Sequence, residues 1–125
     1  MLDRKKTLLL IDDDFKQLVL RKRVLELSGF TVVAAGNAQR GMQLLEAETP
    51  DAVVLDYEMP KMTGDVLASN IRRANGAIPI VMLSGSSVVP SSALTAVDAF
   101  LSKATHPSVL LETIESLVQA QEVFA

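Results

Sequence analysis

The chain has 125 residues, of which 49% are hydrophobic and 22% are charged, and it carries a formal net charge of −3. This length suits one compact domain, so we expect a single domain over residues 1–125 with its core at about 7–120. The acidic balance argues against direct binding of nucleic acid, which normally requires a concentrated basic surface. Because the chain has no cysteine, disulfides, thiol catalysis and cysteine-ligated metal centres are excluded.

The apolar stretches of the chain are short. Runs such as 8–11 and 80–83 fall far below the roughly 20 residues that a membrane-spanning helix requires. The charged segment Met1 to Lys6 is not followed by a long apolar segment with a small-residue cleavage site, so a secretory signal is not expected. We therefore expect a cytoplasmic protein with no membrane partner.

Short apolar runs alternate with helical patterns along the whole chain. Strands are expected at 7–11, 30–35, 52–55, 80–83 and 99–102. Helices are expected from about 15 to 28, 37 to 48, 65 to 74, 93 to 97 and from 107 onward. Such alternation with short connections requires parallel strands joined by right-handed crossovers. The sequence thus predicts an α/β fold, a doubly wound five-stranded parallel sheet with helices on both faces.

Polar residues follow four of the five predicted strands. They are Asp12, Asp13 and Asp14 after the first strand, Asp56 after the third, Ser84 after the fourth and Lys103 after the fifth. In open parallel sheets ligands bind outside the carboxyl ends of the strands, where these residues can converge. Three adjacent carboxylates repel one another, which suggests that they bind a cation. One of them, Asp13 or Asp14, can also cap the following helix.

Each of these residues also has a purely structural interpretation. Asp56 can cap a loop, Ser84 can stabilise a turn, and Lys103 can extend from a strand end toward water. Taken singly, none of the three indicates a function. Their expected convergence at one edge of the sheet is what favours a functional site.

Four motifs in this order resemble the receiver domain of bacterial two-component response regulators. They are Ile-Asp-Asp-Asp from Ile11, Asp-Tyr-Glu-Met-Pro-Lys-Met-Thr-Gly from Asp56, Ser-Gly from Ser84 and Phe-Leu-Ser-Lys from Phe100. The resemblance spans Leu8 to Val118, and four motifs at predicted strand ends are far more specific than any one of them. It implies one receiver domain with a flavodoxin-like fold and the strand order 2-1-3-4-5.

The resemblance also implies roles for three catalytic positions. Asp56 matches the phosphoacceptor, a carboxylate that attacks a phosphoryl group and forms an acyl phosphate. Ser84 matches the hydroxyl that bonds a phosphoryl oxygen after transfer, and Lys103 matches the basic residue that pairs with the phosphoryl group. In such transfers the protein mainly supplies positioning and charge neutralisation.

A magnesium ion is the cofactor that the resemblance implies. The matching ligands are Asp12, Asp13, Asp56 and the backbone carbonyl of Glu58, and we select Asp13 for direct ligation. Mg²⁺ prefers octahedral oxygen ligation and keeps several waters, so a few carboxylates and one carbonyl suit it. Asp14 lies outside this set and is expected to cap the helix.

The implied partners follow from the same family. The donor is a histidine kinase or a phosphotransfer protein, and the output is a separate protein or an output domain outside these residues. The family uses the surface of its fourth helix, fifth strand and fifth helix for partners and often for a homodimer. The expected chemistry is limited to self-phosphorylation and self-dephosphorylation, so the chain is not expected to be an enzyme for a metabolite.

Three features of the sequence depart from the family pattern. The usual lysine-proline pair is replaced by Lys103-Ala104, so we expect either a trans bond with a shifted loop or a strained bond. Phe100 stands at the aromatic switch position and lacks a tyrosine hydroxyl. The segment 84–103 is shorter than in most members, so the fourth helix is expected to be short and the partner surface altered. His106, just before Pro107, is expected to cap the last helix.

Two other functions remain open from the sequence. One is an interaction module with a receiver-like fold in which phosphorylation is vestigial, an alternative motivated by the altered lysine loop and short fourth helix. The other is a phosphatase or phosphomutase with an aspartyl nucleophile, because Glu58 lies two residues after Asp56, where those enzymes place a second carboxylate. The acidic pair Asp12 and Asp13 and the lack of room for a cap domain argue against this enzyme.

Overall fold

A five-stranded parallel sheet with the order β2-β1-β3-β4-β5 forms the centre of the protein. The structure is a computed structural model that describes residues 5–86 and 89–124. The strands are β1 Thr7–Ile11, β2 Thr31–Ala35, β3 Ala52–Asp56, β4 Ile80–Ser84 and β5 Ala99–Ser102. The helices are α1 Phe15–Leu27, α2 Ala38–Glu48, α3 Gly64–Ala74, the 3₁₀ turn η1 Ser91–Leu94 and α4 Pro107–Phe124. The predicted fold class and strand order are confirmed.

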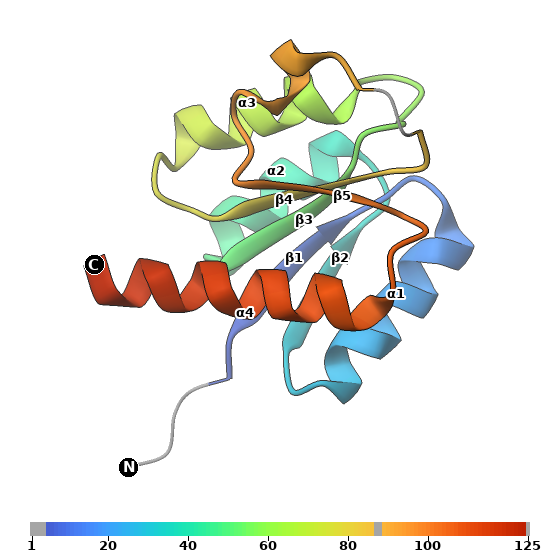
Figure 1. Cartoon of the computed structure of the whole chain (residues 1–125). Helices are drawn as coiled ribbons and strands as arrows, with labels where there is room; N and C mark the ends of the chain where they lie inside the picture. Colours follow the sequence, from blue (N-terminus) through green and yellow to red (C-terminus); the bar gives the residue numbers. More distant parts are fainter. Residues whose placement is uncertain (1–4, 87–88, 125) are drawn as a thin grey trace.

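Helices cover both faces of the sheet (Figure 1). On one face α1 and α4 pack through Leu18, Leu25 and Ile114 onto β1, β3 and β4. On the other face α2 and α3 pack through leucines and isoleucines such as Leu67 and Ile71. The three inner strands are buried on both sides, which explains why their sequences are continuous apolar runs. Within the described ranges no helix has the length and apolar character of a membrane span.

Side chains cap the first turns of three helices. The Asp14 carboxylate accepts hydrogen bonds from the backbone N–H groups of Lys16 and Gln17. The Asn37 side chain accepts one from the Arg40 N–H at 2.8 Å, and the His106 ring accepts one from the Ser108 N–H at 3.1 Å. Each bond satisfies a donor that the first helical turn leaves without a partner. The capping roles predicted for Asp14 and His106 are confirmed.

The predicted fourth helix is wrong in type and position. We expected a short helix at 93–97, but the chain forms a single 3₁₀ turn, η1, at Ser91–Leu94. Pro90 precedes this turn and the chain must reach β5 at Ala99, so too few residues remain for an α-helix. The described residues therefore form four α-helices and one 3₁₀ turn, in place of the five helices expected.

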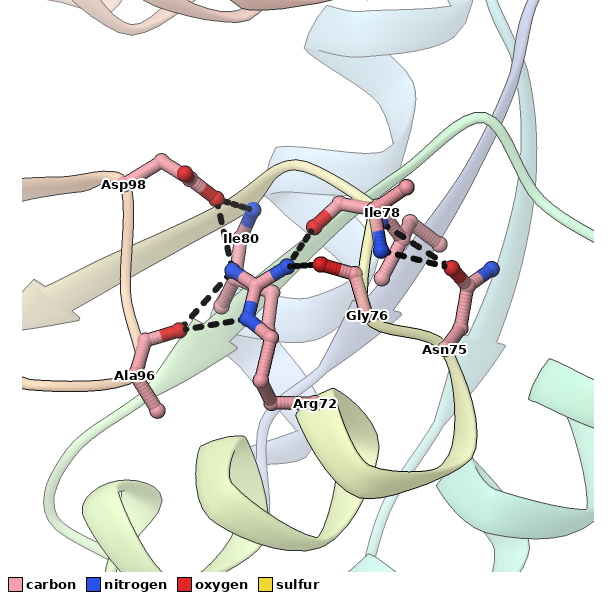
Figure 2. Close-up of polar contacts among 8 residues, drawn as sticks. Arg72, Asn75, Gly76, Ile78, Ile80, Ala96 and Asp98 are labelled. Atoms are coloured by element: carbon pink, nitrogen blue, oxygen red, sulfur yellow. Dashed lines mark hydrogen bonds and ion pairs between the residues drawn. The ribbon is translucent and has the colours of Figure 1, made fainter.

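Arg72 of α3 anchors the short segment that leads from η1 to β5 (Figure 2). Its guanidinium donates to the carbonyl of Ala96 through two nitrogens and pairs with the Asp98 carboxylate at 2.8 Å. It also donates to the carbonyls of Gly76 and Ile78, the latter at 2.7 Å. One planar side chain thus satisfies three backbone carbonyls of two loops, which only the forked donors of arginine allow.

Arg72→Ala should therefore destabilise the fold. The variant leaves the half-buried carbonyls of Ala96 and Ile78 without their charged donor, so we expect the free energy of unfolding to fall by about 2 to 3 kcal/mol. Urea unfolding followed by circular dichroism measures this difference. The matched control is Arg73→Ala, because Arg73 is an exposed neighbour on the same helix and its guanidinium donates to Asn70 of that helix. Equal effects of the two substitutions would contradict an anchoring role for Arg72.

Candidate functional site at the carboxyl edge of the sheet

Asp56 is the last residue of β3 and lies at the centre of the site. Its side chain is almost completely buried, with 3% of the residue exposed. Gly64 makes the close packing at this point feasible, because a Cβ there would lie 2.5 Å from the carbonyl oxygen of Asp56. The Gly64 N–H donates to the carbonyl of Tyr57, which fixes the start of α3 against the loop that follows Asp56. The glycine at position 64 thus allows α3 to pack closely against the loop and keeps the Asp56 carboxylate largely out of contact with water.

Lys103 reaches Asp56 from the end of β5. Its ammonium nitrogen lies 2.9 Å from Asp56 Oδ1, and the Lys103 side chain is 18% exposed. Parallel pairing of β4 with β5 sets Ser84 opposite Ser102, so the next residue, Lys103, extends beyond the edge. The bond between Lys103 and Ala104 is trans. Of the two alternatives expected for that bond, the trans form is present, and it still brings the ammonium group to Asp56.

The aspartates after β1 divide into different environments. Asp12 is fully buried, whereas Asp13 and Asp14 are exposed. The buried Asp12 carboxylate accepts from the Asp14 N–H at 2.9 Å and from the Arg21 guanidinium at 3.1 Å. Arg21 comes from the middle of α1 and is itself 16% exposed. A buried charge requires such partners, and the guanidinium of Arg21 offsets part of the negative charge of Asp12.

Oxygens of Asp12, Asp13 and Asp56 lie within 4.8 Å of one another. Two of these carboxylates are buried and one is exposed, so a cation between them would contact protein on one side and water on the other. This donor set fits Mg²⁺, which prefers oxygen ligands, commonly binds one or two carboxylates directly and retains several waters. Asp12, Asp13 and Asp56 would hold such an ion, and its charge would offset the repulsion between them.

The pKa of Asp56 is raised from its ordinary 3.8 to about 6, mainly by burial and to a smaller extent by the nearby negative charge of Asp12. The hydrogen bond and charge of Lys103 and the hydrogen bond from the Glu58 N–H oppose this rise. Above pH 6 the carboxylate is therefore mainly ionised, which is the form that can act as a nucleophile. Its ionisation in the buried site nevertheless costs folding free energy.

The metal-free protein should lose stability as the pH rises through the pKa of Asp56. Because the folded pKa lies above the unfolded value, the folded state binds the extra proton between about pH 4 and about pH 6, and its stability falls across that window. In Asp56→Asn this dependence is absent. We therefore expect the free energy of unfolding of Asp56→Asn to increase relative to that of the wild type, by about 2 to 3 kcal/mol between about pH 4 and about pH 7.5.

Denaturant unfolding of both proteins in EDTA at the two pH values measures that difference. EDTA removes divalent cations that would lower the pKa of Asp56 by their charge. A difference that stays constant between the two pH values would contradict a raised pKa for Asp56.

Glu58 uses its side chain in a way that the sequence did not indicate. Its carboxylate accepts hydrogen bonds from the Ser84 hydroxyl and the Gly85 N–H, both at 2.6 Å. Its N–H donates to Asp56 Oδ1 at 3.2 Å. The sequence analysis considered this carboxylate as the second carboxylate of a possible phosphatase. In the structure it instead connects the loop after β3 to the end of β4.

The predicted site residues lie at one edge of the sheet, and Arg21, which the sequence analysis missed, joins them. Asp12, Asp13, Asp56 and Lys103 surround one position, and Ser84 is bonded to Glu58 beside it. Gly85 was expected beside Ser84, but its hydrogen bond to Glu58 was not predicted. The sequence signal for Arg21 is a cation on the helix that follows an acidic cluster. Because Lys22 and Arg23 stand next to it, that signal does not identify which cation contacts Asp12.

Comparisons with known proteins agree with this geometry. Residues 8–115 match the family described as the response regulator receiver domain. The transcriptional regulatory protein PhoP of Bacillus subtilis, named for alkaline phosphatase synthesis, is 26% identical over 123 residues, which cover 96% of this chain and 51% of PhoP. GlrR of Escherichia coli, another transcriptional regulatory protein, is 29% identical over 90% of this chain and 26% of its own length. The chain thus spans about half or less of these relatives.

Solved structures resemble the whole chain. A CheY-like response regulator receiver domain protein of Methanospirillum hungatei has a TM-score of 0.91 and 28% identity, with 98% of this chain and 100% of that chain covered. The response regulator TrrA of Thermotoga maritima, solved in complex with Mg²⁺ and BeF, has a TM-score of 0.85 and 27% identity over 90% and 98% of the two chains. The chain belongs to the family of response regulator receiver domains.

Proposed function

We propose that Asp56 accepts a phosphoryl group from a phosphohistidine donor, with Mg²⁺ bound beside it, and that this modification switches the surface that binds a partner. The observation that carries the proposal is the contact of a buried carboxylate with Lys103 at 2.9 Å, within 4.8 Å of two further carboxylates. Such a site combines a nucleophile, a cation that pairs with phosphoryl oxygens and ligands for Mg²⁺.

The proposed transfer is an in-line displacement at phosphorus. A carboxylate oxygen of Asp56 forms a bond to phosphorus while the bond from phosphorus to the histidine nitrogen breaks. Oδ1 already accepts from Lys103 and from the Glu58 N–H, so we assign the attack to Oδ2. Bound Mg²⁺ would offset negative charge on the phosphoryl oxygens. Lys103 positions Oδ1, and the buried surroundings restrict the approach of water.

The donor is proposed to be a histidine kinase or a phosphotransfer protein that docks on α1. The outer face of this helix exposes Phe15, Val19 and Leu20 at 75%, 48% and 68%. Such an exposed apolar patch is typical of a protein-binding surface, and it begins beside Asp13 and Asp14 at the edge of the site. A donor that binds there could present its phosphohistidine to Asp56.

The output is proposed to be a separate protein or an output domain outside these residues, in the cytoplasm. PhoP and GlrR are named as transcriptional regulatory proteins, and this chain corresponds to only part of each. The surface formed by η1, β5 and α4 corresponds to the partner and homodimer surface of the family. Because η1 is a single turn, the partner is proposed to differ from one that recognises a full helix.

A phosphatase that uses Asp56 as its nucleophile is less well supported. Such an enzyme requires a second carboxylate that is free to donate and accept a proton at the substrate. The Glu58 carboxylate is instead bonded to Ser84 and Gly85. We therefore propose that the chain catalyses only its own phosphorylation and dephosphorylation.

Intact mass measurement tests the proposed function. The protein is incubated with phosphoramidate, a small phosphoryl donor, in Mg²⁺ or in EDTA. We expect a gain of one phosphoryl group, about 80 daltons, that requires Mg²⁺. No gain, with Mg²⁺ binding verified by calorimetry, would favour an interaction module whose phosphorylation is vestigial.

A further inference from the structure

The Glu58 side chain connects two elements whose relative positions matter for the proposed phosphorylation. Its Oε2 accepts from the buried Ser84 hydroxyl, and its Oε1 accepts from the Gly85 N–H, each at 2.6 Å. These distances are typical of short hydrogen bonds to a charged acceptor. The bonds join the loop between β3 and α3 to the carboxyl end of β4.

Both donors are fully occupied by this carboxylate. A serine hydroxyl and a backbone N–H each carry one hydrogen, so neither can donate to a second acceptor at full strength. Ser84 is also fixed as an acceptor, because the Ser86 N–H donates to its Oγ at 3.0 Å. The Ser84 hydroxyl therefore cannot bond a phosphoryl oxygen until Glu58 releases it.

The Glu58 carboxylate and the Lys103 side chain both lie close to Gly85. A Cβ built on Gly85 would be 3.5 Å from Glu58 Oε1 and 4.0 Å from Cδ of Lys103, so these two side chains flank the same position. Lys103 in turn contacts Asp56. A phosphoryl group on Asp56 that bonds Ser84 and Lys103 would carry up to two negative charges and would repel the Glu58 carboxylate, which is bonded to the same serine.

We propose that Glu58 is an internal anion that occupies the phosphoryl-binding donors of the unmodified protein and is displaced when Asp56 is phosphorylated. In the displacement the Ser84 hydroxyl and the Gly85 N–H exchange carboxylate oxygens for phosphoryl oxygens, so the number of hydrogen bonds is conserved. Glu58 is an exposed residue, so its carboxylate can turn into water once the phosphoryl oxygens take over the two donors. This inference rests on the proposed function, because it requires Asp56 to carry the phosphoryl group.

The displacement has a mechanical consequence. Before phosphorylation Glu58 ties the loop 57–63 to the end of β4, and afterward the link runs from Asp56 to β4 through the phosphoryl group. The loop after β3 then loses its side-chain connection to Ser84, and Glu58 becomes available at the surface near Lys103. The contact thus restrains the unmodified state, because phosphorylation must break two charge-assisted hydrogen bonds.

Substitution of Glu58 tests this restraint through the rate of phosphorylation. In Glu58→Ala the donors are free and the repulsion is removed, so we expect phosphoramidate and Mg²⁺ to phosphorylate the variant about tenfold faster than the wild type. Glu58→Gln, which keeps the shape and one acceptor oxygen, should lie between the two. Glu46→Ala is the matched control, since this exposed carboxylate lies near the end of α2, at the opposite edge of the sheet. A rate for Glu58→Ala equal to or below that of the wild type would overturn the inference.

Amide hydrogen exchange in the unphosphorylated proteins gives a readout that needs no donor. The Gly85 N–H should exchange faster in Glu58→Ala than in the wild type or in Glu46→Ala, because it has lost its acceptor. Unchanged protection of Gly85 would overturn the inference even if phosphorylation proceeds. If neither the wild type nor any variant gains phosphoryl mass, the proposed function fails and the inference fails with it.

Discussion

Asp56→Asn should abolish phosphorylation while the fold is kept. The asparagine amide has nearly the shape of the carboxylate and can still accept from the Glu58 N–H, but it has no anionic oxygen to attack phosphorus. We expect the gain of about 80 daltons with phosphoramidate and Mg²⁺ to disappear completely. Because the substitution removes a buried charge, and with it the smaller repulsion from Asp12, the variant should also melt at a higher temperature than the wild type at neutral pH.

Glu46→Gln is the matched control for this substitution. It replaces one carboxylate by an amide on an exposed part of α2 and should gain the phosphoryl group as the wild type does. Phosphorylation of Asp56→Asn at the wild-type rate would assign the acceptor to another residue, with Asp12 and Asp13 the nearest carboxylates. Loss of the gain in both variants would mean that a carboxylate-to-amide change alters the protein generally.

The sheet could be predicted because its signals are local. Continuous apolar runs such as 8–11 and 52–55 identify strands buried on both faces, and the alternation with helices forces them to be parallel. The edge site follows from the same reasoning, since the residue after each inner strand must lie at the carboxyl edge. Asp56, Ser84 and Lys103 were placed correctly by this topology alone, although their roles in phosphoryl transfer remain proposals.

The contacts between side chains could not be predicted, because they depend on how distant segments meet. The bond from Ser84 to Glu58 joins residues 26 positions apart, as does the ion pair of Arg72 with Asp98. Nothing in the local pattern distinguishes Arg72, which anchors two loops, from Arg73, which is exposed. The 3₁₀ turn was also missed, because an apolar pattern over so few residues cannot separate it from a short α-helix.

Packing of α1 differed from the simplest interpretation of its sequence as well. Phe15, Leu18, Val19 and Leu25 recur at helical spacing, yet Phe15 and Val19 are 75% and 48% exposed while Leu18 and Leu25 are buried. The middle of the helix supplies Arg21 to the buried Asp12. An amphipathic pattern therefore located the helix but did not tell which of its apolar residues form the core and which are available to a partner.

Asp13→Asn should greatly weaken the response of phosphorylation to Mg²⁺. Asp12 already accepts from Arg21 and from the Asp14 N–H, whereas Asp13 is exposed and can contribute an oxygen to the ion without first breaking those contacts. Loss of an outer-shell partner of a metal ligand typically costs about 10- to 100-fold in metal affinity, so loss of a direct ligand should cost at least as much. We therefore expect the Mg²⁺ concentration for half-maximal phosphorylation to rise by at least about tenfold.

Asp14→Asn provides the neighbouring control. Asn is as good a helix cap as Asp, so the variant should keep α1 and its contacts while removing one carboxylate from the same acidic segment. If general negative charge attracted Mg²⁺, both variants would weaken the response to a similar extent. A selective effect of Asp13→Asn, measured by phosphoryl gain across a Mg²⁺ titration and by calorimetry, would identify Asp13 as a ligand. Equal effects would instead assign the ion to the buried pair Asp12 and Asp56, with Asp13 contributing only its charge.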